Sequence, residues 1–297
     1  MKILLLGAGG QVGTELRRSL AVAGVVTACG RGEADLQDAR QLAQVLATSQ
    51  ADVVVNAAAY TAVDKAQTEP DAARRINAEA VAELAAHCHK TGSLLVHYST
   101  DYVFDGMLSR PYTEADATHP LSIYGQTKLQ GEEAIRASGC RHLVFRTSWV
   151  YSATGGNFLK TILKLAADRD ELRVVADQWG APTSARLLAE VTTRVISELA
   201  EMDEHWGTYH LTAGGETNWH AYASYAIARA RSQGLPLQVK NIVPIPAADY
   251  PTPAARPANS RLDCGKLSST FSLQLPDWRR DVDSVVDTLV AAASSTP

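Results

Sequence analysis

Residues 3–13 read ILLLGAGGQVG, and this stretch decides the fold class. Its first part, Ile3–Leu6, is a continuous apolar run, which is typical of a strand buried on both faces of a parallel sheet. A helical pattern of apolar residues follows over 12–23. Between them lies a G-x-x-G-x-x-G pattern. The stretch therefore predicts the strand–turn–helix unit that opens a dinucleotide-binding fold.

Each glycine of this pattern has a physical task. Gly7 makes the tight turn, Gly10 lets backbone N–H groups approach a pyrophosphate, and Gly13 lets the helix pack closely on the strand. The helix N-terminus also offers partial positive charge to phosphates. We therefore expect the turn to bind a dinucleotide cofactor through Gly7, Gly10, Gln11, Val12 and Gly13.

The first half of the chain repeats the alternation of strand and helix. Short apolar runs recur at 25–28, 52–55, 94–98 and 142–146, with helical patterns between them. Such spacing predicts a doubly wound, parallel α/β sheet of the Rossmann type, with right-handed crossovers. We expect this dinucleotide-binding domain to span residues 1–150.

The second half is less regular. Helical patterns occur at 187–199, 219–231 and 282–290, and five prolines between residues 244 and 261 predict an extended, irregular segment. We expect residues 151–297 to form mainly a smaller α/β substrate-binding region, with some segments returning to the first domain.

Composition excludes several functional classes. The chain has 297 residues, 20% of them charged, and a net charge of −4, which gives no electrostatic reason to expect nucleic acid or an anionic membrane as partner. No apolar stretch reaches membrane length. The four cysteines are widely spread, as expected for free thiols in a reducing compartment. We expect a soluble, cytoplasmic protein.

The end of the second expected strand bears on cofactor choice. An acidic residue there would bind ribose hydroxyls, but the chain has Arg31, which can pair with a 2′-phosphate and favours NADPH over NADH. Asp35 and Leu36 follow, where we expect the adenine. Small residues after the third strand would let the backbone approach the cofactor. These are Ala57, Ala58 and Ala59, followed by Tyr60.

Tyr124 and Lys128 form a Y-x-x-x-K pattern on an expected helix, so they share one face. An ammonium beside a phenol favours the phenolate, so we expect Lys128 to lower the pKa of Tyr124 towards neutrality. Tyr124 can then donate a proton to a carbonyl oxygen while hydride attacks the carbon. Lys128 is also expected to hydrogen-bond the nicotinamide ribose.

A third group is expected from the end of the fourth strand, because carboxyl ends of parallel strands open into the binding crevice. Ser99 is expected on the cofactor side there. The Thr100 hydroxyl can polarise a substrate carbonyl, and the Asp101 carboxylate can bind substrate hydroxyls.

Several longer motifs together resemble the dTDP-4-dehydrorhamnose reductases, a family of extended short-chain dehydrogenases/reductases. The resemblance covers nearly the whole chain. Its motifs are 7–13, 56–64, 99–106, 124–128, 146–151, 177–183 and 256–263. It implies reduction of the 4-keto group of dTDP-6-deoxy-L-lyxo-4-hexulose to dTDP-L-rhamnose.

The same resemblance implies roles for individual residues. Thr100, Asp101, Tyr124, Lys128 and Trp149 match the family's active site, with Trp149 flanking the sugar. By the same resemblance, the residues that line the nucleotide-sugar pocket are Gln178, Pro182 and Thr183, and Arg256 meets the diphosphate.

One departure concerns a metal. Some bacterial members bind Mg²⁺ at a homodimer interface through acidic side chains. Glu15 and Glu190 stand at corresponding positions, but Val191 replaces a second adjacent acid, which puts both the metal and that dimer in doubt. Two alternatives stay open at this point: another nucleotide-sugar enzyme such as a 4-epimerase, and a non-catalytic relative similar to the regulatory subunit of methionine adenosyltransferase.

Overall fold

A computed structural model describes residues 1–199 and 204–294. Its centre is a six-stranded sheet with the order β10-β5-β4-β3-β1-β2, in which every pairing is parallel. The strands are β1 (Lys2–Leu6), β2 (Val25–Cys29), β3 (Val53–Asn56), β4 (Leu94–Thr100), β5 (His142–Thr147) and β10 (Gly207–His210).

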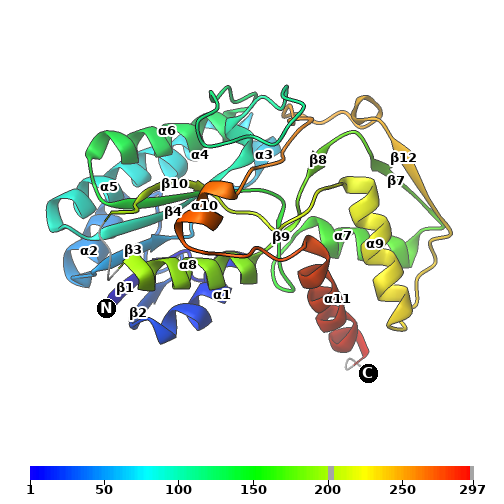
Figure 1. The fold of residues 1–297 in the computed structure, drawn as a ribbon, viewed down its shortest axis with the longest axis horizontal. Helices are drawn as coiled ribbons and strands as arrows, with labels where there is room; N and C mark the ends of the chain where they lie inside the picture. The colour runs from blue at the N-terminus through cyan, green and yellow to red at the C-terminus, as the bar shows by residue number, and fades with distance from the viewer. Residues whose placement is uncertain (200–203, 295–297) are drawn as a thin grey trace.

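Helices cover both faces of this sheet (Figure 1). Side chains of a strand alternate between faces, so Ile3 and Leu5 lie in one apolar core and Leu4 and Leu6 in another. The first core includes residues of α1 (Gln11–Ser19) and α8 (Ala185–Leu199). The second includes residues of α2 (Ala39–Ser49), α5 (Ala80–Thr91) and α6 (Ile123–Ser138). The strands are apolar runs because both faces are buried.

The strand order reverses between β1 and β3, which lie side by side. In open parallel sheets, ligands bind outside the carboxyl ends of the strands at such a point. The glycine-rich turn follows β1 there, and the Ala57 N–H after β3 donates to the Leu6 carbonyl at 3.0 Å. The topology thus brings the turn and the alanine segment together.

The remaining elements form a smaller lobe and several connections (Figure 1). The lobe contains α7 (Phe158–Asp168), β7 (Glu171–Val175), α9 (Trp219–Ser232), β12 (Asn241–Ile245) and α11 (Trp278–Ser294). The shorter strands are β6 (Val150–Tyr151), β8 (Trp179–Gly180), β9 (Thr183–Ser184) and β11 (Thr217–Asn218). The shorter helices are α3 (Val63–Ala66), α4 (Pro70–Arg74), α10 (Gly265–Thr270), the π-helix η2 (Arg75–Glu79) and the 3₁₀ turns η1 (Leu20–Val22), η3 (Asp101–Val103) and η4 (Ala247–Asp249).

The five strands expected in the first half are confirmed, as is the Rossmann-type class. The sequence did not predict the sixth strand, β10. Its four residues include a glycine and a histidine and form no apolar run that would indicate a buried strand. Pro244 lies inside β12, although the proline-rich segment was expected to be irregular. It is tolerated because β12 pairs with β7 alone and needs no second ladder of hydrogen bonds.

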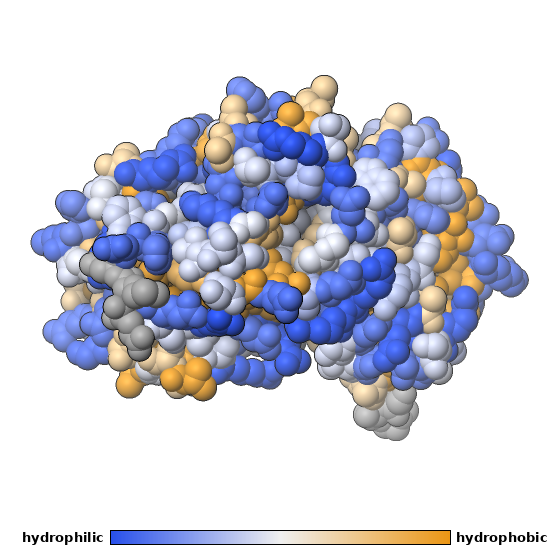
Figure 2. Space-filling view, viewed as in Figure 1, coloured by the Kyte–Doolittle hydropathy of each residue, from blue (hydrophilic) through white to orange (hydrophobic). Residues whose placement is uncertain are grey.

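The surface shown in Figure 2 is mostly hydrophilic, with apolar residues in separate patches. All four cysteines are free, as expected. Among the described residues, no helix combines the length and apolar character needed to cross a membrane.

Candidate active site

A cavity of about 850 Å³ opens at the carboxyl edge of the sheet. It is lined by residues of the glycine turn, the loop after β2, the segment after β3, the end of β4, α6 and the segment after β5. The expected site residues on its wall are Gly7, Gly10, Gln11, Val12, Arg31, Asp35, Leu36, Ala57, Ala58, Ala59, Ser99, Thr100, Asp101, Tyr124, Lys128 and Trp149.

The glycine turn fits a dinucleotide phosphate. Gly7 has a left-handed φ of +76°, and a Cβ there would lie 2.6 Å from the Ala58 nitrogen. A Cβ on Gly13 would lie 2.0 Å from the Gly7 oxygen, so helix and strand can approach only with glycine at this position. Gly10 precedes α1, and no side chain caps the helix there. The first-turn N–H groups of α1 are therefore suited to bind an anion.

Other expected residues lie away from the cavity wall. The Tyr60 hydroxyl donates to Glu69, and Gly13 packs against Gly7. Thr183 is fully buried, and its Oγ1 donates to the Ala181 carbonyl at 3.1 Å. Gln178 is half-buried and Pro182 is buried. Arg256 Nη2 donates to Asp64 Oδ2 at 2.9 Å. Ligand-binding roles for these residues stay predictions.

Tyr124 is placed by the first turn of α6. The Ser122 side chain caps this helix by accepting from the Gly125 N–H at 3.2 Å, and a Cβ on Gly125 would lie 2.2 Å from the Tyr102 oxygen. Burial raises the pKa of Tyr124 to about 12, against the opposing effect of a hydrogen bond with Thr100. The phenol therefore carries its proton at neutral pH, as a proton donor to a carbonyl must.

The Lys128 amine contacts groups other than the phenol. Its Nζ donates to the Tyr98 carbonyl at 2.6 Å and lies 3.0 Å from His97 Nε2. Burial lowers the pKa of Lys128 to about 8, although the charge of Glu132 acts in the opposite direction. The expectation that Lys128 brings the pKa of Tyr124 towards neutrality is therefore wrong for this arrangement. One helical turn places the two residues on one face but does not orient the amine.

Thr100 and Asp101 join the end of β4 to η3. Thr100 Oγ1 donates to Asp101 Oδ1 at 3.0 Å and accepts from the Tyr102 N–H at 3.2 Å. Burial raises the pKa of Asp101 to about 6, while hydrogen bonds from Ser260 and Thr100 limit the rise. The carboxyl group thus stands beside the phenol and its threonine partner, on the wall of the cavity.

The raised pKa of Asp101 predicts a pH-dependent effect on stability. The folded-state pKa of about 6 exceeds the ordinary value of 3.8, so this group destabilises the fold progressively as pH rises from about 4 through 6. Asp101→Asn removes this ionisation. We expect its free energy of unfolding, relative to the native sequence, to gain about 2–3 kcal/mol between pH 4 and pH 7.5. Urea unfolding at the two pH values measures this change.

The exposed Asp71 provides the control for that measurement, because its side chain is 95% exposed. Asp71→Asn should show no comparable change between the two pH values. A difference for Asp101→Asn that does not vary with pH would contradict the assignment of a raised pKa.

Trp149 lies on the cavity wall in a constrained conformation. Its φ of +50° is left-handed, which is costly for a bulky residue. The indole stacks on Trp219 with ring centroids 3.6 Å apart, and a Cβ on Gly180 would lie 2.7 Å from its Cε2. Sequence reasoning missed Trp219, because its position at the start of a helix carried no sign of contact with the site.

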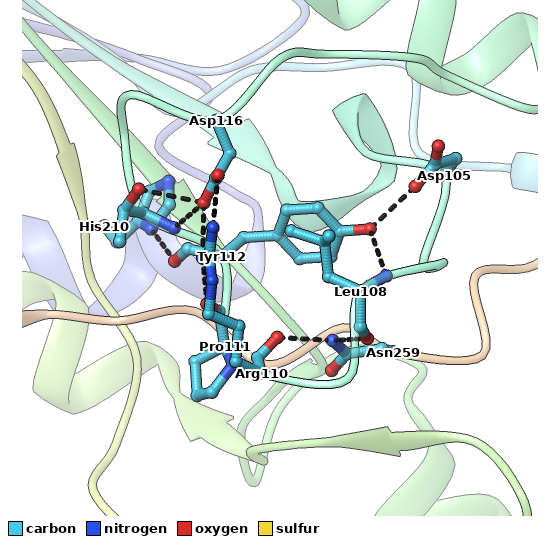
Figure 3. A network of polar contacts seen from close by, with 9 residues as sticks. Asp105, Leu108, Arg110, Pro111, Tyr112, Asp116, His210 and Asn259 are labelled. Atoms are coloured by element: carbon cyan, nitrogen blue, oxygen red, sulfur yellow. Dashed lines mark hydrogen bonds and ion pairs between the residues drawn. The ribbon is translucent and has the colours of Figure 1, made fainter.

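A polar network holds the loop that follows η3 in place (Figure 3). Tyr112 Oη donates to Asp105 Oδ1 at 2.7 Å, and Asn259 Nδ2 donates to the Leu108 carbonyl at 2.7 Å. On the other side, His210 Nδ1 lies 3.0 Å from the Tyr112 carbonyl. The network ties the loop that follows Asp101 to β10 and to the proline-rich segment.

Nothing in the structure supports the Mg²⁺ site. Glu190 Oε1 accepts from Arg186 Nε at 2.7 Å, and Glu15 also lies near enough to favour the charged form of that arginine. Within residues 1–199 and 204–294, no group of three or more His, Cys, Asp or Glu side chains could hold a metal ion.

Comparisons with known proteins agree with this geometry. The model of the RmlD substrate binding domain family matches residues 1–291. A dTDP-4-dehydrorhamnose reductase from Burkholderia thailandensis is 50% identical, over 98% of this chain and 100% of its own length. The Escherichia coli K12 reductase is 45% identical, over 97% and 98%.

Solved structures point the same way. The Clostridium acetobutylicum dTDP-4-dehydrorhamnose reductase has a TM-score of 0.90 at 37% identity, covering 97% of this chain and 99% of that one. The Bacillus anthracis reductase, solved in complex with NADP, has a TM-score of 0.86 at 31% identity, covering 96% and 99%. The chain therefore belongs to the RmlD family, that of the dTDP-4-dehydrorhamnose reductases.

Proposed function

We propose that this chain is an NADPH-dependent reductase that converts the 4-keto group of dTDP-6-deoxy-L-lyxo-4-hexulose to the alcohol and so forms dTDP-L-rhamnose. The observation that carries this proposal is the protonated phenol of Tyr124 on the wall of a cavity that also contains a phosphate-binding turn. The family and its curated reductases supply the substrate class.

The residues of the site have separate tasks in this reaction. NADPH, when bound, supplies the hydride. The glycine turn and the N-terminus of α1 bind phosphates. Tyr124 donates its proton to the developing alkoxide oxygen, and Thr100 hydrogen-bonds the phenol. To polarise the same oxygen, the Thr100 hydroxyl would have to exchange Asp101 for the substrate as its acceptor. The buried Asp101 beside Thr100 is suited to accept a hydrogen bond from a sugar hydroxyl.

Cofactor preference rests on Arg31. Its side chain is exposed at the cavity wall, where it can pair with a 2′-phosphate. Glu33 accepts from the Gly30 N–H at 2.8 Å, so the backbone turn that presents Arg31 is held in place. These contacts support NADPH over NADH. No contact supports a bound Mg²⁺.

Residues 151–297 mainly serve the nucleotide sugar in this proposal, and residues 1–150 the cofactor. Trp149 offers an apolar face to a 6-deoxysugar. Gln178, Pro182 and Thr183 belong to the segment around β8 and β9, whose Gly180 contacts Trp149. Arg256 would have to exchange Asp64 for a diphosphate.

A direct assay tests the proposal. The purified protein is mixed with NADPH and the dTDP-4-keto sugar, NADPH absorbance is followed, and the product is identified by NMR. We expect dTDP-L-rhamnose, with kcat/KM for NADPH about tenfold or more above NADH, as one charge-assisted contact provides. Failure to consume NADPH, or equal rates with an unrelated ketone, would overturn the assignment.

A further inference from the structure

Three buried polar residues form a hydrogen-bonded row that ends at the cavity wall, where Lys128 lies. Asn56 ends β3, His97 lies in β4 and Lys128 lies in α6, and each is only 1% exposed. Asn56 Nδ2 lies 3.2 Å from His97 Nδ1, and His97 Nε2 lies 3.0 Å from Lys128 Nζ. The donor and acceptor roles along this row are linked, because each contact needs one donor and one acceptor. The row therefore has a direction.

The backbone fixes that direction at one end. The Ala58 N–H can only donate, and it donates to Asn56 Oδ1 at 3.1 Å. The amide nitrogen of Asn56 therefore faces His97 and donates to Nδ1. Burial of the ring holds the pKa of His97 well below its usual value, so the ring is neutral. With Nδ1 accepting, the single ring proton resides on Nε2.

At the other end of the row, Lys128 faces this ring proton. His97 Nε2–H points at Lys128 Nζ, which must accept and therefore carries a lone pair. The same Nζ donates to the Tyr98 carbonyl at 2.6 Å, which a neutral amine can do as well. A Lys128 ammonium would place its own N–H opposite the His97 Nε2–H, so that two donors face each other. This conflict could be relieved only if Asn56 turned its amide and gave up the bond from Ala58.

The charged and titratable groups around Lys128 do not reverse this preference. From α6, Glu132 favours the ammonium, but Arg146 of β5 binds both of its oxygens. Tyr124 of α6 and Tyr98 of β4 are both neutral, since burial raises the pKa of each. Asp101, which follows β4, is engaged by Thr100. Burial itself disfavours the charged amine.

We propose that Asn56 and His97 are positioning residues that favour the unprotonated amine of Lys128 until NADPH binds, so that cofactor binding is accompanied by proton uptake from solvent at Lys128. This inference rests on the proposed function. The step is the addition of one proton to –NH₂ to give –NH₃⁺, with no other bond made or broken. Ribose hydroxyl oxygens accept from an ammonium and phosphates attract it, so the bound cofactor favours the charged form. The positive charge of Lys128 is then completed only in the complex.

Calorimetry of NADPH binding at pH 8, in two buffers of different ionisation enthalpy, measures the proton uptake. We expect uptake of about half a proton per site for the native chain, since a pKa of about 8 leaves about half of the Lys128 amine unprotonated at this pH. Asn56→Asp reverses the donor and acceptor roles along the row. A carboxylate accepts from both the Ala58 N–H and His97 Nδ1–H, so His97 Nε2 is left to accept from a Lys128 ammonium. His97→Gln also offers an acceptor. Both variants should bind NADPH with almost no uptake.

The matched control is His142→Gln. His142 is a second buried histidine, in β5, and its Nδ1 contacts the Cys140 carbonyl at 2.8 Å. This variant should take up as many protons as the native chain. Equal uptake in all four proteins, or binding to the native chain without uptake, would overturn the inference.

A second readout does not depend on NADPH. The ¹³Cε resonance of Lys128, assigned by its loss in Lys128→Arg, reports the charge of the amine during a pH titration. We expect its midpoint to be at least one unit higher in Asn56→Asp than in the native chain, and an unchanged midpoint would overturn the inference. If NADPH does not bind at all, the proposed function fails, and this titration still decides the state of Lys128.

Discussion

Replacing Tyr124 with phenylalanine is expected to lower kcat by about two to four orders of magnitude, the usual contribution of a general acid. The phenol carries its proton because burial raises its pKa, and phenylalanine keeps the ring but removes that proton. The affinity for NADPH should barely change, because the glycine turn and the N-terminus of α1 are intact. Steady-state assays give kcat, and fluorescence titration gives the Kd for NADPH.

The control for this variant is Tyr209→Phe. Tyr209 is also buried, but its hydroxyl donates to the His205 carbonyl, away from the cavity wall. Its kcat should stay close to that of the native chain. Full activity in Tyr124→Phe would remove the phenol from the mechanism.

Replacing Glu132 with alanine is expected to destabilise the fold by about 3–5 kcal/mol, as removal of one partner from a buried ion pair does. Glu132 is fully buried and accepts from Arg146 Nε at 2.9 Å and from Arg146 Nη2 at 2.6 Å. Burial alone would raise its pKa, but the Arg146 contacts hold the pKa below its usual value. Without the carboxylate, the buried guanidinium of Arg146 loses its counter-charge.

Urea unfolding measures this loss, and Glu190→Ala is the matched control. The pair between Glu190 and Arg186 is exposed, so its removal should cost less than about 1 kcal/mol. Equal losses in the two variants would contradict the importance of the buried pair. Glu132 also accepts from Ser99, so this cluster fixes the end of β4 directly before Thr100.

Backbone geometry made the glycine turn predictable from sequence. Gly7 has a left-handed φ, and a Cβ on either Gly7 or Gly13 would collide with neighbouring backbone. Both positions therefore require glycine, and that requirement is visible in the local sequence. Helical periodicity likewise placed Tyr124 and Lys128 on one face. The class of fold followed from the alternation of apolar runs and helical patterns.

Contacts between distant segments could not be predicted in the same way. The amine of Lys128 turns to His97, which lies 31 positions earlier in the chain, and no local pattern records that choice. Trp219 reaches Trp149 only because the tertiary fold places the start of α9 beside the segment after β5. Strand β10 is short and depends on β5 for its pairing. Each of these features depends on tertiary packing rather than on local preference.

A crystal structure with bound NADPH tests the central claim most directly. A substrate carbonyl must touch both the hydride donor and the phenol. The nicotinamide C4 and Tyr124 Oη should therefore lie within about 6–7 Å of each other, which is the sum of two near-attack contacts of about 3–3.5 Å. A ring held well beyond that distance, or a phenol turned into the core, would contradict the assignment of Tyr124 as proton donor.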